Sequence, residues 1–312
     1  MQDLDTAALD CLAALADDGS FERAAQRLAI TQSAVSQRLR ALEAQVGQLL
    51  VVRSRPLRLT EPGKLLLRFA RQLQAMRADV ARELGQQVHT QARLPIAVNA
   101  DSLATWVLPA LDALVQQGLD DGFGLELIVD DQDFTHERLR QGQVLGCVST
   151  VPQALRGCRV AALGVMRYVA VASPGFVERQ LGGDAAGGLH RGNFARLPFL
   201  VFNRKDDMQA QWVARAFGVR APRLAERFVP SSEAYVRAAL LGWGIGVVPE
   251  LQVRERLGAG ELLQLHPAVS LKVALHWHQW KLGGETGPAA RAARLDEVGA
   301  ALARGARTAL GG

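Results

Sequence analysis

Apolar residues at helical spacing predict three short helices within the first 46 residues. A helix through Leu9 and Leu15 ends at Asp18-Gly19-Ser20, where the glycine interrupts it. Ser20 is placed to cap a second helix, and Thr31 is placed to cap a third that ends at Gly47. Only a short turn separates the second and third helices, which is the arrangement of a helix-turn-helix.

The third predicted helix has two different faces. Its apolar face consists of Val35, Leu39, Leu42 and Val46. Its opposite face consists of Ser33, Ser36, Gln37 and Arg40. Short hydrogen-bonding side chains and an arginine can donate to phosphates and contact base edges in a DNA major groove. We therefore predict a DNA recognition helix, with Gln32 and Thr31 at its entrance and Arg23 on the preceding helix as further DNA-contact candidates.

An arginine-rich hairpin is predicted after this helix. Leu50-Val51-Val52 and Leu57 to Leu59 have the apolar character of two short strands, with Pro56 between them. Arg53, Arg55 and Arg58 lie in or beside the turn and suit phosphates or a narrow minor groove. Residues 1–59 are accordingly predicted to form a winged helix-turn-helix domain whose partner is double-stranded DNA.

A long amphipathic helix is predicted over residues 60–89, with Thr60 as its cap and Pro62 in its first turn. Its apolar seam alternates steps of three and four residues: Leu66, Phe69, Leu73, Met76 and Val80. A lone helix cannot bury such a seam, so we predict a linker helix that also dimerises the chain. The alternative is that the seam packs on its own domain.

Beyond residue 89, strands alternate with helical stretches. This rhythm predicts an α/β domain with a parallel sheet over residues 90–312. Two such units follow one another, from about Pro95 to Thr150 and from about Tyr168 to Val248. We therefore predict a bilobed ligand-binding domain with a cleft.

Charge is concentrated near the N-terminus of a chain whose net charge is only +5. Residues 20–71 hold ten basic residues against three acidic ones, a balance of +7. This favours a polyanionic partner, although a solvated helix face is the alternative. The acidic start of the chain does not resemble a secretory signal, and no apolar stretch is long enough for a membrane span. Three widely spaced cysteines suit a reducing compartment, so a cytoplasmic protein is predicted.

The ordered motifs of the N-terminal region resemble those of LysR-type transcriptional regulators. They are Ser20 to Leu28, Thr31 to Leu39, Leu42-Glu43, Arg53 and Leu59 to Gly63. The resemblance implies a winged helix-turn-helix, a linker helix and a periplasmic-binding-protein-like effector domain whose second lobe (165–268) is inserted into the first (94–164 plus 269–312). It also implies homodimers or homotetramers and RNA polymerase as a partner. One departure is Leu50-Val51-Val52-Arg53, where the family commonly has Leu-Phe-x-Arg.

Further motifs narrow the resemblance to the ArgP/LysG branch of that family. They are Asn99 to Trp106, Leu108 to Leu111, Asn203 to Met208 and Ser231 to Ala234. That branch senses lysine and arginine and activates a gene for a basic amino-acid exporter. The resemblance implies the same class of effector and the same activating role here.

Candidate effector contacts lie where predicted strands end and helices begin, because ligands of bilobed α/β domains meet those ends. They are Asn99, Asp101, Ser102, Asp130, Asp131, Ser149, Thr150, Phe202, Asn203, Ser232 and Glu233. Hydroxyl and amide groups suit the carboxylate of an amino acid, and the acidic residues suit its cationic centres. The alternative is that Asp101 and Glu233 only cap helices and that Asp131 lies in a turn.

The motifs of other protein classes are weak or missing. Gly242 to Gly246 resembles a dinucleotide-binding loop, but it follows a helix and precedes a strand, the reverse of the required order. His276 and His278 share a strand face without a third ligand near them in the sequence. We predict a protein that is not an enzyme and has no metal or cofactor. Two alternatives stay open: a redox-sensing regulator that uses Cys147 and Cys158, and a stand-alone amino-acid-binding protein.

Overall fold

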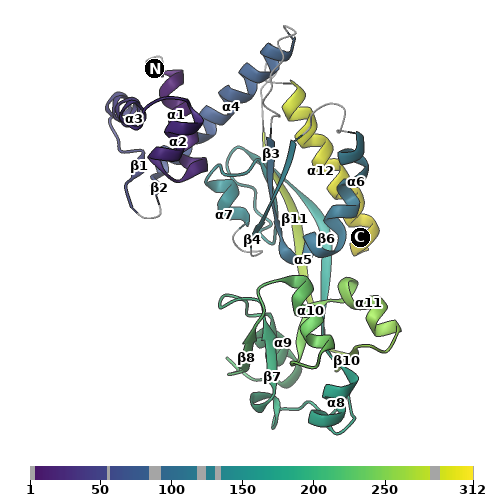
Figure 1. The fold of residues 1–312 in the computed structure, drawn as a ribbon. Helices are drawn as coiled ribbons and strands as arrows, with labels where there is room; N and C mark the ends of the chain where they lie inside the picture. The colour runs from purple at the N-terminus through teal and green to yellow at the C-terminus, as the bar shows by residue number, and fades with distance from the viewer. Residues whose placement is uncertain are drawn as a thin grey trace.

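The computed structural model describes residues 4–54, 57–83, 93–117, 124–130, 135–281 and 289–311. A helical N-terminal domain is followed by the long helix α4 (Glu61–Glu83) and a two-lobed α/β domain (Figure 1). These features confirm the predicted fold class. None of the described helices is long and apolar enough to span a membrane.

The N-terminal domain is built from α1 (Thr6–Asp18), α2 (Phe21–Arg27), α3 (Gln32–Val46) and the hairpin of β1 (Val51–Val52) and β2 (Arg58–Leu59). The predicted caps are present: Ser20 Oγ accepts from the Arg23 amide at 3.3 Å, and Thr31 Oγ1 accepts from the Ala34 amide at 3.2 Å. Gly47 adopts the left-handed conformation that ends α3, with φ at 73°. The apolar faces of α1 and α3 meet in one buried core.

The helix α4 begins against this core. Thr60 Oγ1 accepts from the Gly63 amide at 3.1 Å, and a Cβ at Gly63 would collide with the carbonyl oxygen of Leu50. Leu67 and Ala70 are buried in the core of the N-terminal domain. The predicted dimerisation seam divides between two faces. Leu66 and Leu73 pack against that core, whereas Phe69, Met76 and Val80 are exposed together with Leu65.

The effector domain is organised on one seven-stranded sheet. Its strands are β3 (Arg93–Asn99), β4 (Gly124–Asp130), β5 (Gly146–Ser149), β6 (Cys158–Ala172), β9 (Gly246–Pro249), β10 (Leu263–Leu265) and β11 (Leu271–Trp280). The order is β10-β6-β11-β5-β3-β4, with β9 paired to β6. In lobe I, β3 runs parallel to β4 and β5. The predicted parallel sheet is only partly correct, because β11 pairs antiparallel with β5 and β6, and β6 pairs antiparallel with β9 and β10. The helical elements of lobe I are α5 (Ala100–Ser102), a π-helical turn (Leu103–Val107), α6 (Leu108–Gln117), α7 (Thr135–Arg140) and α12 (Ala289–Leu310).

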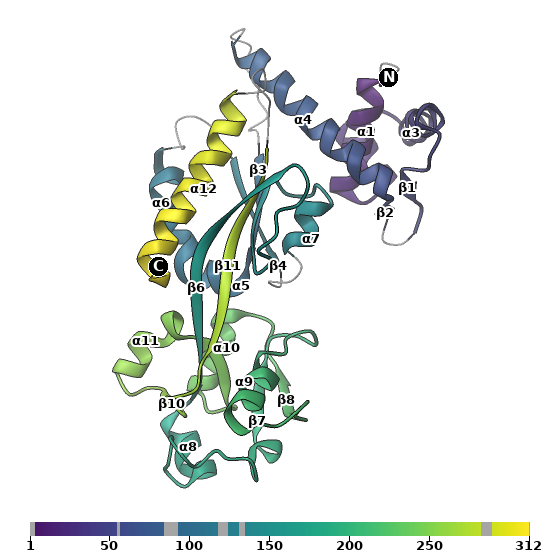
Figure 2. The same ribbon diagram turned by 180° about the vertical axis from the view of Figure 1, so that it is seen from behind.

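Lobe II lies at the far ends of the long strands β6 and β11, which run antiparallel from one lobe to the other (Figure 2). Its remaining elements are α8 (Pro174–Leu181), a 3₁₀ turn (Phe194–Arg196), β7 (Pro198–Val201), α9 (Met208–Phe217), β8 (Ala225–Phe228), α10 (Ser232–Leu240) and α11 (Glu250–Gly258). β7 and β8 form a parallel pair, and a bridge from Phe199 to Ile245 attaches this pair beside β9. The two lobes therefore share strands, and the space between them lies beside β6.

Candidate DNA interface and effector pocket

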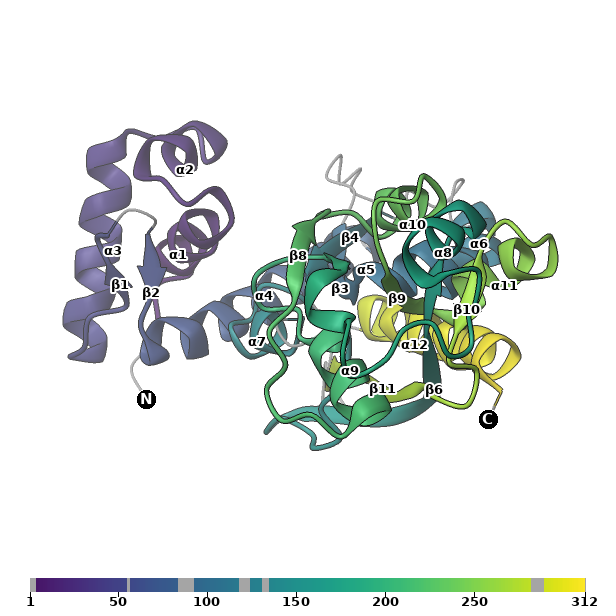
Figure 3. The same cartoon turned by 90° about the horizontal axis from the view of Figure 1, so that it is seen from below.

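The candidate recognition helix α3 lies on the side of its domain that faces away from the effector lobes (Figure 3). Its apolar residues Val35 and Leu39 are buried, which fixes the orientation of the opposite face. That face presents Gln32, Ser33, Gln37 and Arg40 as exposed side chains and Ser36 as a half-buried one. The face matches the predicted one and is free to approach a groove.

The other DNA candidates surround this helix. Thr31 Oγ1 caps α3 and lies 2.9 Å from Ser33 Oγ. The Arg53 guanidinium lies over the Phe21 ring, 5.1 Å from its centroid, so the wing is attached to α2. Arg23, in the first turn of α2, is exposed and donates to the carbonyl of Asp18 at the end of α1. Arg58 is exposed on β2, and Arg55 lies outside the described residues.

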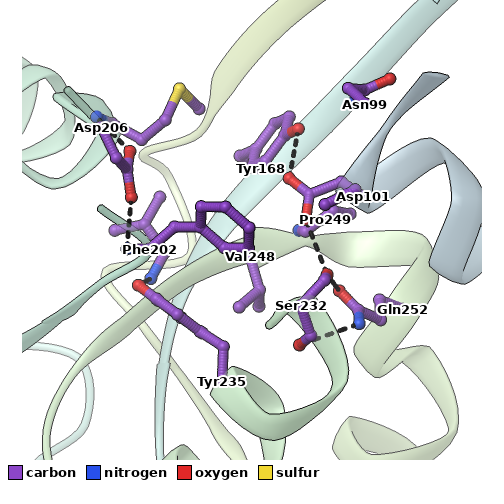
Figure 4. Close-up of a pocket in the computed structure, with 13 residues that line it drawn as sticks. Asn99, Asp101, Tyr168, Phe202, Asp206, Ser232, Tyr235, Val248, Pro249 and Gln252 are labelled. Carbon is purple, nitrogen blue, oxygen red and sulfur yellow. Dashed lines mark hydrogen bonds between the residues drawn. The ribbon is translucent and has the colours of Figure 1, made fainter. Parts of the chain in front are cut away.

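A pocket of about 550 Å³, measured with its open mouth, lies between the two lobes beside β6 (Figure 4). It draws on the end of β3, the start of α5, β6, the β7–α9 loop, α10, β9 and α11. Its lining residues are Asn99, Ala100, Asp101, Tyr168, Phe202, Asp206, Met208, Ser232, Tyr235, Val247, Val248, Pro249 and Gln252. Ligand pockets for small molecules have this mixture of apolar and polar groups.

Asp101 connects three elements at one side of the pocket. It lies in α5 of lobe I, and its Oδ2 accepts from the Tyr168 hydroxyl on β6 at 2.8 Å. Its Oδ1 accepts from Ser232 Oγ, at the start of α10 in lobe II, at 2.7 Å. Gln252 of α11 donates through Nε2 to the Ser232 carbonyl at 3.3 Å. Asp101 therefore forms a hydrogen bond across the cleft as well as lining it (Figure 4).

Asp206 enters the pocket from lobe II and is held by neighbours along its own chain. Its Oδ2 accepts from the Phe202 amide at 2.9 Å and from Gln209 Nε2 at 3.0 Å. Its Oδ1 accepts from the Met208 amide at 3.1 Å. Three N–H donors fix the direction of this carboxylate.

Tyr235 is connected to Asp206 through Gln209. Its hydroxyl donates to the Leu200 carbonyl at 2.6 Å and accepts from Gln209 Nε2 at 2.9 Å and from the Val247 amide at 3.2 Å. Burial raises the pKa of the Tyr235 phenol, so the hydroxyl keeps its proton. The same Gln209 amide thus connects the buried phenol to the carboxylate of Asp206.

The charge of the pocket is negative. Its lining residues include two carboxylates, Asp101 and Asp206, and none of the lining residues that the structure describes is lysine, arginine or histidine. Asn99 Oδ1 and the neighbouring Ser102 Oγ are buried and have no hydrogen-bond partner among the described residues. Buried polar atoms without partners are costly unless a ligand or a water satisfies them. The pocket therefore suits a cationic ligand that also has hydrogen-bonding groups.

The structure brings together only some of the effector candidates. Asn99, Asp101, Phe202 and Ser232 line the pocket, and Ser102 is buried beside Asp101. Four others are elsewhere among the described residues: Ser149, Thr150, Asn203 and Glu233. Ser149 Oγ and Asn203 Oδ1 accept from nearby backbone amides, and Glu233 is exposed in the first turn of α10. Asp131 and the side chain of Asp130 lie outside the described residues.

Several pocket residues were missing from the sequence predictions. They are Ala100, Tyr168, Asp206, Met208, Tyr235, Gln252 and the segment 247–249. Asp206 did carry a signal, because it lies between the end of one strand and the start of α9 in a stretch that supported the family resemblance. Tyr168 and Gln252 carried none, since only the packing of β6 and α11 brings them to the cleft.

The alternative chemistries find little support in the geometry. Cys147 and Cys158 are buried free thiols; burial raises the pKa of both, that of Cys158 to about 12. Thiols held in the protonated form are poor nucleophiles and poor redox sensors. Within the described parts of the chain, no group of three or more histidine, cysteine or acidic residues could hold a metal ion.

Comparisons with known proteins agree with this architecture. Residues 6–64 match the model of the bacterial regulatory helix-turn-helix proteins of the lysR family, and residues 87–294 match the LysR substrate binding domain. The chain belongs to the LysR family of transcriptional regulators. The predicted family is thereby confirmed, and the named relatives are regulators rather than enzymes, as predicted.

Two relatives place the chain in the ArgP/LysG group of this family. It is 43% identical over 283 residues to the transcriptional regulator ArgP of Aeromonas salmonicida, covering 90% of this chain and 92% of the relative. It is 41% identical over 280 residues to LysG of Mycobacterium tuberculosis, covering 89% and 88%.

Solved structures give the same assignment. The crystal structure of ArgP from Mycobacterium tuberculosis superposes with a TM-score of 0.79 at 38% identity, covering 97% of this chain and 98% of that one. Full-length LysG from Corynebacterium glutamicum with bound effector Arg superposes with a TM-score of 0.71 at 32% identity, covering 98% and 99%.

Proposed function

We propose that this LysR-type regulator binds lysine or arginine between its lobes and, in response, activates transcription of an amino-acid exporter gene. The observation that carries the proposal is the charge of the pocket: Asp101 and Asp206 enter it from opposite lobes, and none of its lining residues in the described part of the chain is cationic. The arginine bound to LysG of Corynebacterium glutamicum supports the same class of ligand.

A basic amino acid matches the groups around the pocket. Its α-ammonium and side-chain cation each require an acceptor, and the two carboxylates supply one each. Its carboxylate requires neutral donors, which the backbone N–H groups at the start of α10 can supply. Phe202, Met208 and Val248 offer apolar surface for the methylene chain.

Binding can regulate DNA only if the ligand prefers one arrangement of the lobes. A ligand that contacts Asp101 and Asp206 together connects lobe I to lobe II. The hydrogen bond from Ser232 to Asp101 already crosses the same cleft at 2.7 Å. We infer that the ligand adds to this contact and favours the arrangement in which it forms.

The DNA face and α4 give the other parts of the chain their roles. Residues 1–59 bind the operator through Gln37, Arg40 and their neighbours, residues 60–89 dimerise the chain, and residues 90–312 bind the effector. The exposed stripe of α4 is the surface for a second copy, in homodimers or homotetramers, and consists of Leu65, Phe69, Met76 and Val80. The protein acts in the cytoplasm, with RNA polymerase as a partner at the promoter.

Calorimetric titration of the full-length protein with lysine, arginine, norleucine and glutamate tests the ligand class. Lysine and arginine should bind, and norleucine should bind far more weakly, because it leaves a carboxylate without its cation. Glutamate should not bind, because its second carboxylate would face the acids of the pocket. Equal affinity for norleucine and lysine would rule out a pocket that selects cations. A lysine-dependent rise in transcription from an exporter promoter tests the activating role separately.

A further inference from the structure

Three of the basic residues counted above as a sign of a polyanionic partner are engaged inside the protein. Lys64, Arg68 and Arg71 lie at positions i, i+4 and i+7 of α4 and therefore share one face of the helix. The side chains of Lys64 and Arg71 are each only 15% exposed. This face contacts lobe I of the effector domain, so these charges are not available to DNA.

The contacts with lobe I involve the turn after α7 and the end of β11. Arg71 Nη1 donates to the carbonyl of Gly142. The Arg68 guanidinium lies 4.9 Å from the centre of the Trp280 ring, which is a cation–π contact. Gly142 has φ at 68°, and a Cβ there would lie 2.9 Å from Cγ of Arg68. A side chain at this position would therefore have to displace the Arg68 side chain.

The neighbouring turn of α4 adds a charge contact to the same surface. Lys64 Nζ lies 2.8 Å from Glu61 Oε1 on its own helix and 3.9 Å from Glu137 Oε1 on α7. Arg140 donates to both oxygens of Glu137 at 2.6 and 2.9 Å. Its hydrogen bonds hold the pKa of Glu137 below the ordinary value, so this carboxylate is charged when it faces Lys64.

Arg71 also bonds to the N-terminal domain. Its Nη2 lies 2.6 Å from Oδ1 of Asp17, at the end of α1. Arg77, two turns further along α4, bonds within the N-terminal domain, to Asp10 Oδ2 at 3.1 Å and Thr6 Oγ1 at 3.2 Å. The guanidinium of Arg71 thus connects two domains, whereas that of Arg77 contacts one.

We propose that Arg71 is a positioning residue for DNA binding, which fixes the N-terminal domain against lobe I and so sets the direction in which α3 is presented. The planar guanidinium suits this position because its fork reaches two acceptors in different domains at once, whereas a lysine ammonium is a single point. Paired recognition helices must match the spacing of two half-sites. Arg71 therefore contributes to operator binding without touching DNA.

Distance measurement between two spin labels tests the positioning. One label is attached at Ala44→Cys on α3 and the other at Thr308→Cys on α12, both exposed positions. Labelled chains are mixed with a large excess of unlabelled chains, so that both labels of a measured pair lie in one chain. We expect one narrow distance distribution in the parent and in the control Arg77→Met, and a broad one in Arg71→Met. A distribution in Arg71→Met as narrow as in Arg77→Met would overturn the proposal.

If Arg71→Met does not fold, Asp17→Asn decides the question, because it weakens the bond of Arg71 to α1. The distance distribution of Asp17→Asn should also be broad, and a narrow distribution would overturn the proposal.

The second measurement is DNA affinity. It compares a duplex that the parent selects from random sequences with an unrelated duplex. Arg71→Met should lower the ratio of the two affinities at least about fivefold, the lower end of typical coupling between sites. Affinity for the unrelated duplex should stay the same, because α3 is intact. A broad distribution with an unchanged ratio would refute the role in DNA binding.

Discussion

The two carboxylates of the effector pocket are held in different ways. Asp206 is held within its own lobe, by two backbone N–H groups and by Gln209. Asp101 is held by groups from other elements, namely Tyr168 on β6 and Ser232 on α10 of the opposite lobe. The direction of Asp206 is therefore set before a ligand arrives, whereas the contacts of Asp101 depend on how the lobes lie. We infer that one acid selects the charge of the ligand and that the other couples its binding to the lobes.

Of the variants that test this difference between the two acids, the one that removes the Tyr235 hydroxyl behind Asp206 should have the largest effect. Tyr235→Phe leaves the Leu200 carbonyl, the Val247 amide and Gln209 without their buried partner. Each unsatisfied buried group costs about 1–3 kcal/mol. We expect a clear loss in the free energy of unfolding and weaker lysine binding, because Gln209 no longer has a fixed position beside Asp206. Denaturant unfolding and calorimetry measure the two effects, and unchanged values in both would show that the network is not needed.

Two adjacent serines provide a matched pair for testing the cross-cleft bond. Ser231 Oγ caps α10 by accepting from the Ala234 amide at 3.3 Å, whereas Ser232 Oγ donates to Asp101. Ser231→Ala should lower the free energy of unfolding by about 1 kcal/mol, as the loss of a cap does, and leave the affinity for lysine unchanged. Ser232→Ala should weaken lysine binding, because the arrangement in which the lobes meet loses a hydrogen bond to a charged group. Equal lysine affinities in the two variants would show that the bond between Ser232 and Asp101 does not contribute to lysine binding.

The smallest effect should be a dependence of lobe I stability on pH. Burial lowers the pKa of His136 and of His278, so both bind protons less readily in the folded chain than in the unfolded one, where the pKa of histidine is about 6.5. Their contribution to the free energy of unfolding is therefore complete above that pH and is lost progressively as the pH falls below it. Hydrogen exchange of the β5 and β11 amides at pH 7.5 and 5.5 measures the change. His278→Gln should reduce the dependence, and an identical dependence in that variant would refute the assignment.

The sequence predicted best what lies within single helices. The contact face of α3 follows from residues three and four positions apart, and its limits follow from Thr31 and Gly47, which cap it in the structure. Asp101 and Ser232 were found because strand ends and helix starts meet at clefts. Each of these inferences required only neighbours along the chain.

The rest depended on contacts between distant segments. Tyr168 reaches the pocket through the pairing of β6 with β9, and Gln252 reaches it through the packing of α11. The division of the α4 seam depended on which face the N-terminal core covers, which leaves Leu66 packed and Phe69 exposed. The charge of Arg71 was visible in the sequence, but its two acceptors lie 54 and 71 residues away. Spacing along the chain does not encode such distances.

Titration of Asp206→Asn with lysine and norleucine tests the central claim most directly, with Asp207→Asn as the control. Asp207 is the adjacent acid; it is exposed and accepts from Gln211 Nε2 at 2.7 Å on the outer side of α9. Asp206→Asn should lower lysine affinity by about 1.5–3 kcal/mol, the contribution of a hydrogen bond to a charged group, which is roughly ten- to hundredfold. Norleucine binding should not weaken, and Asp207→Asn should bind lysine like the parent. Unchanged lysine affinity in Asp206→Asn, or an equal loss for lysine and norleucine, would contradict a pocket that selects its ligand by charge.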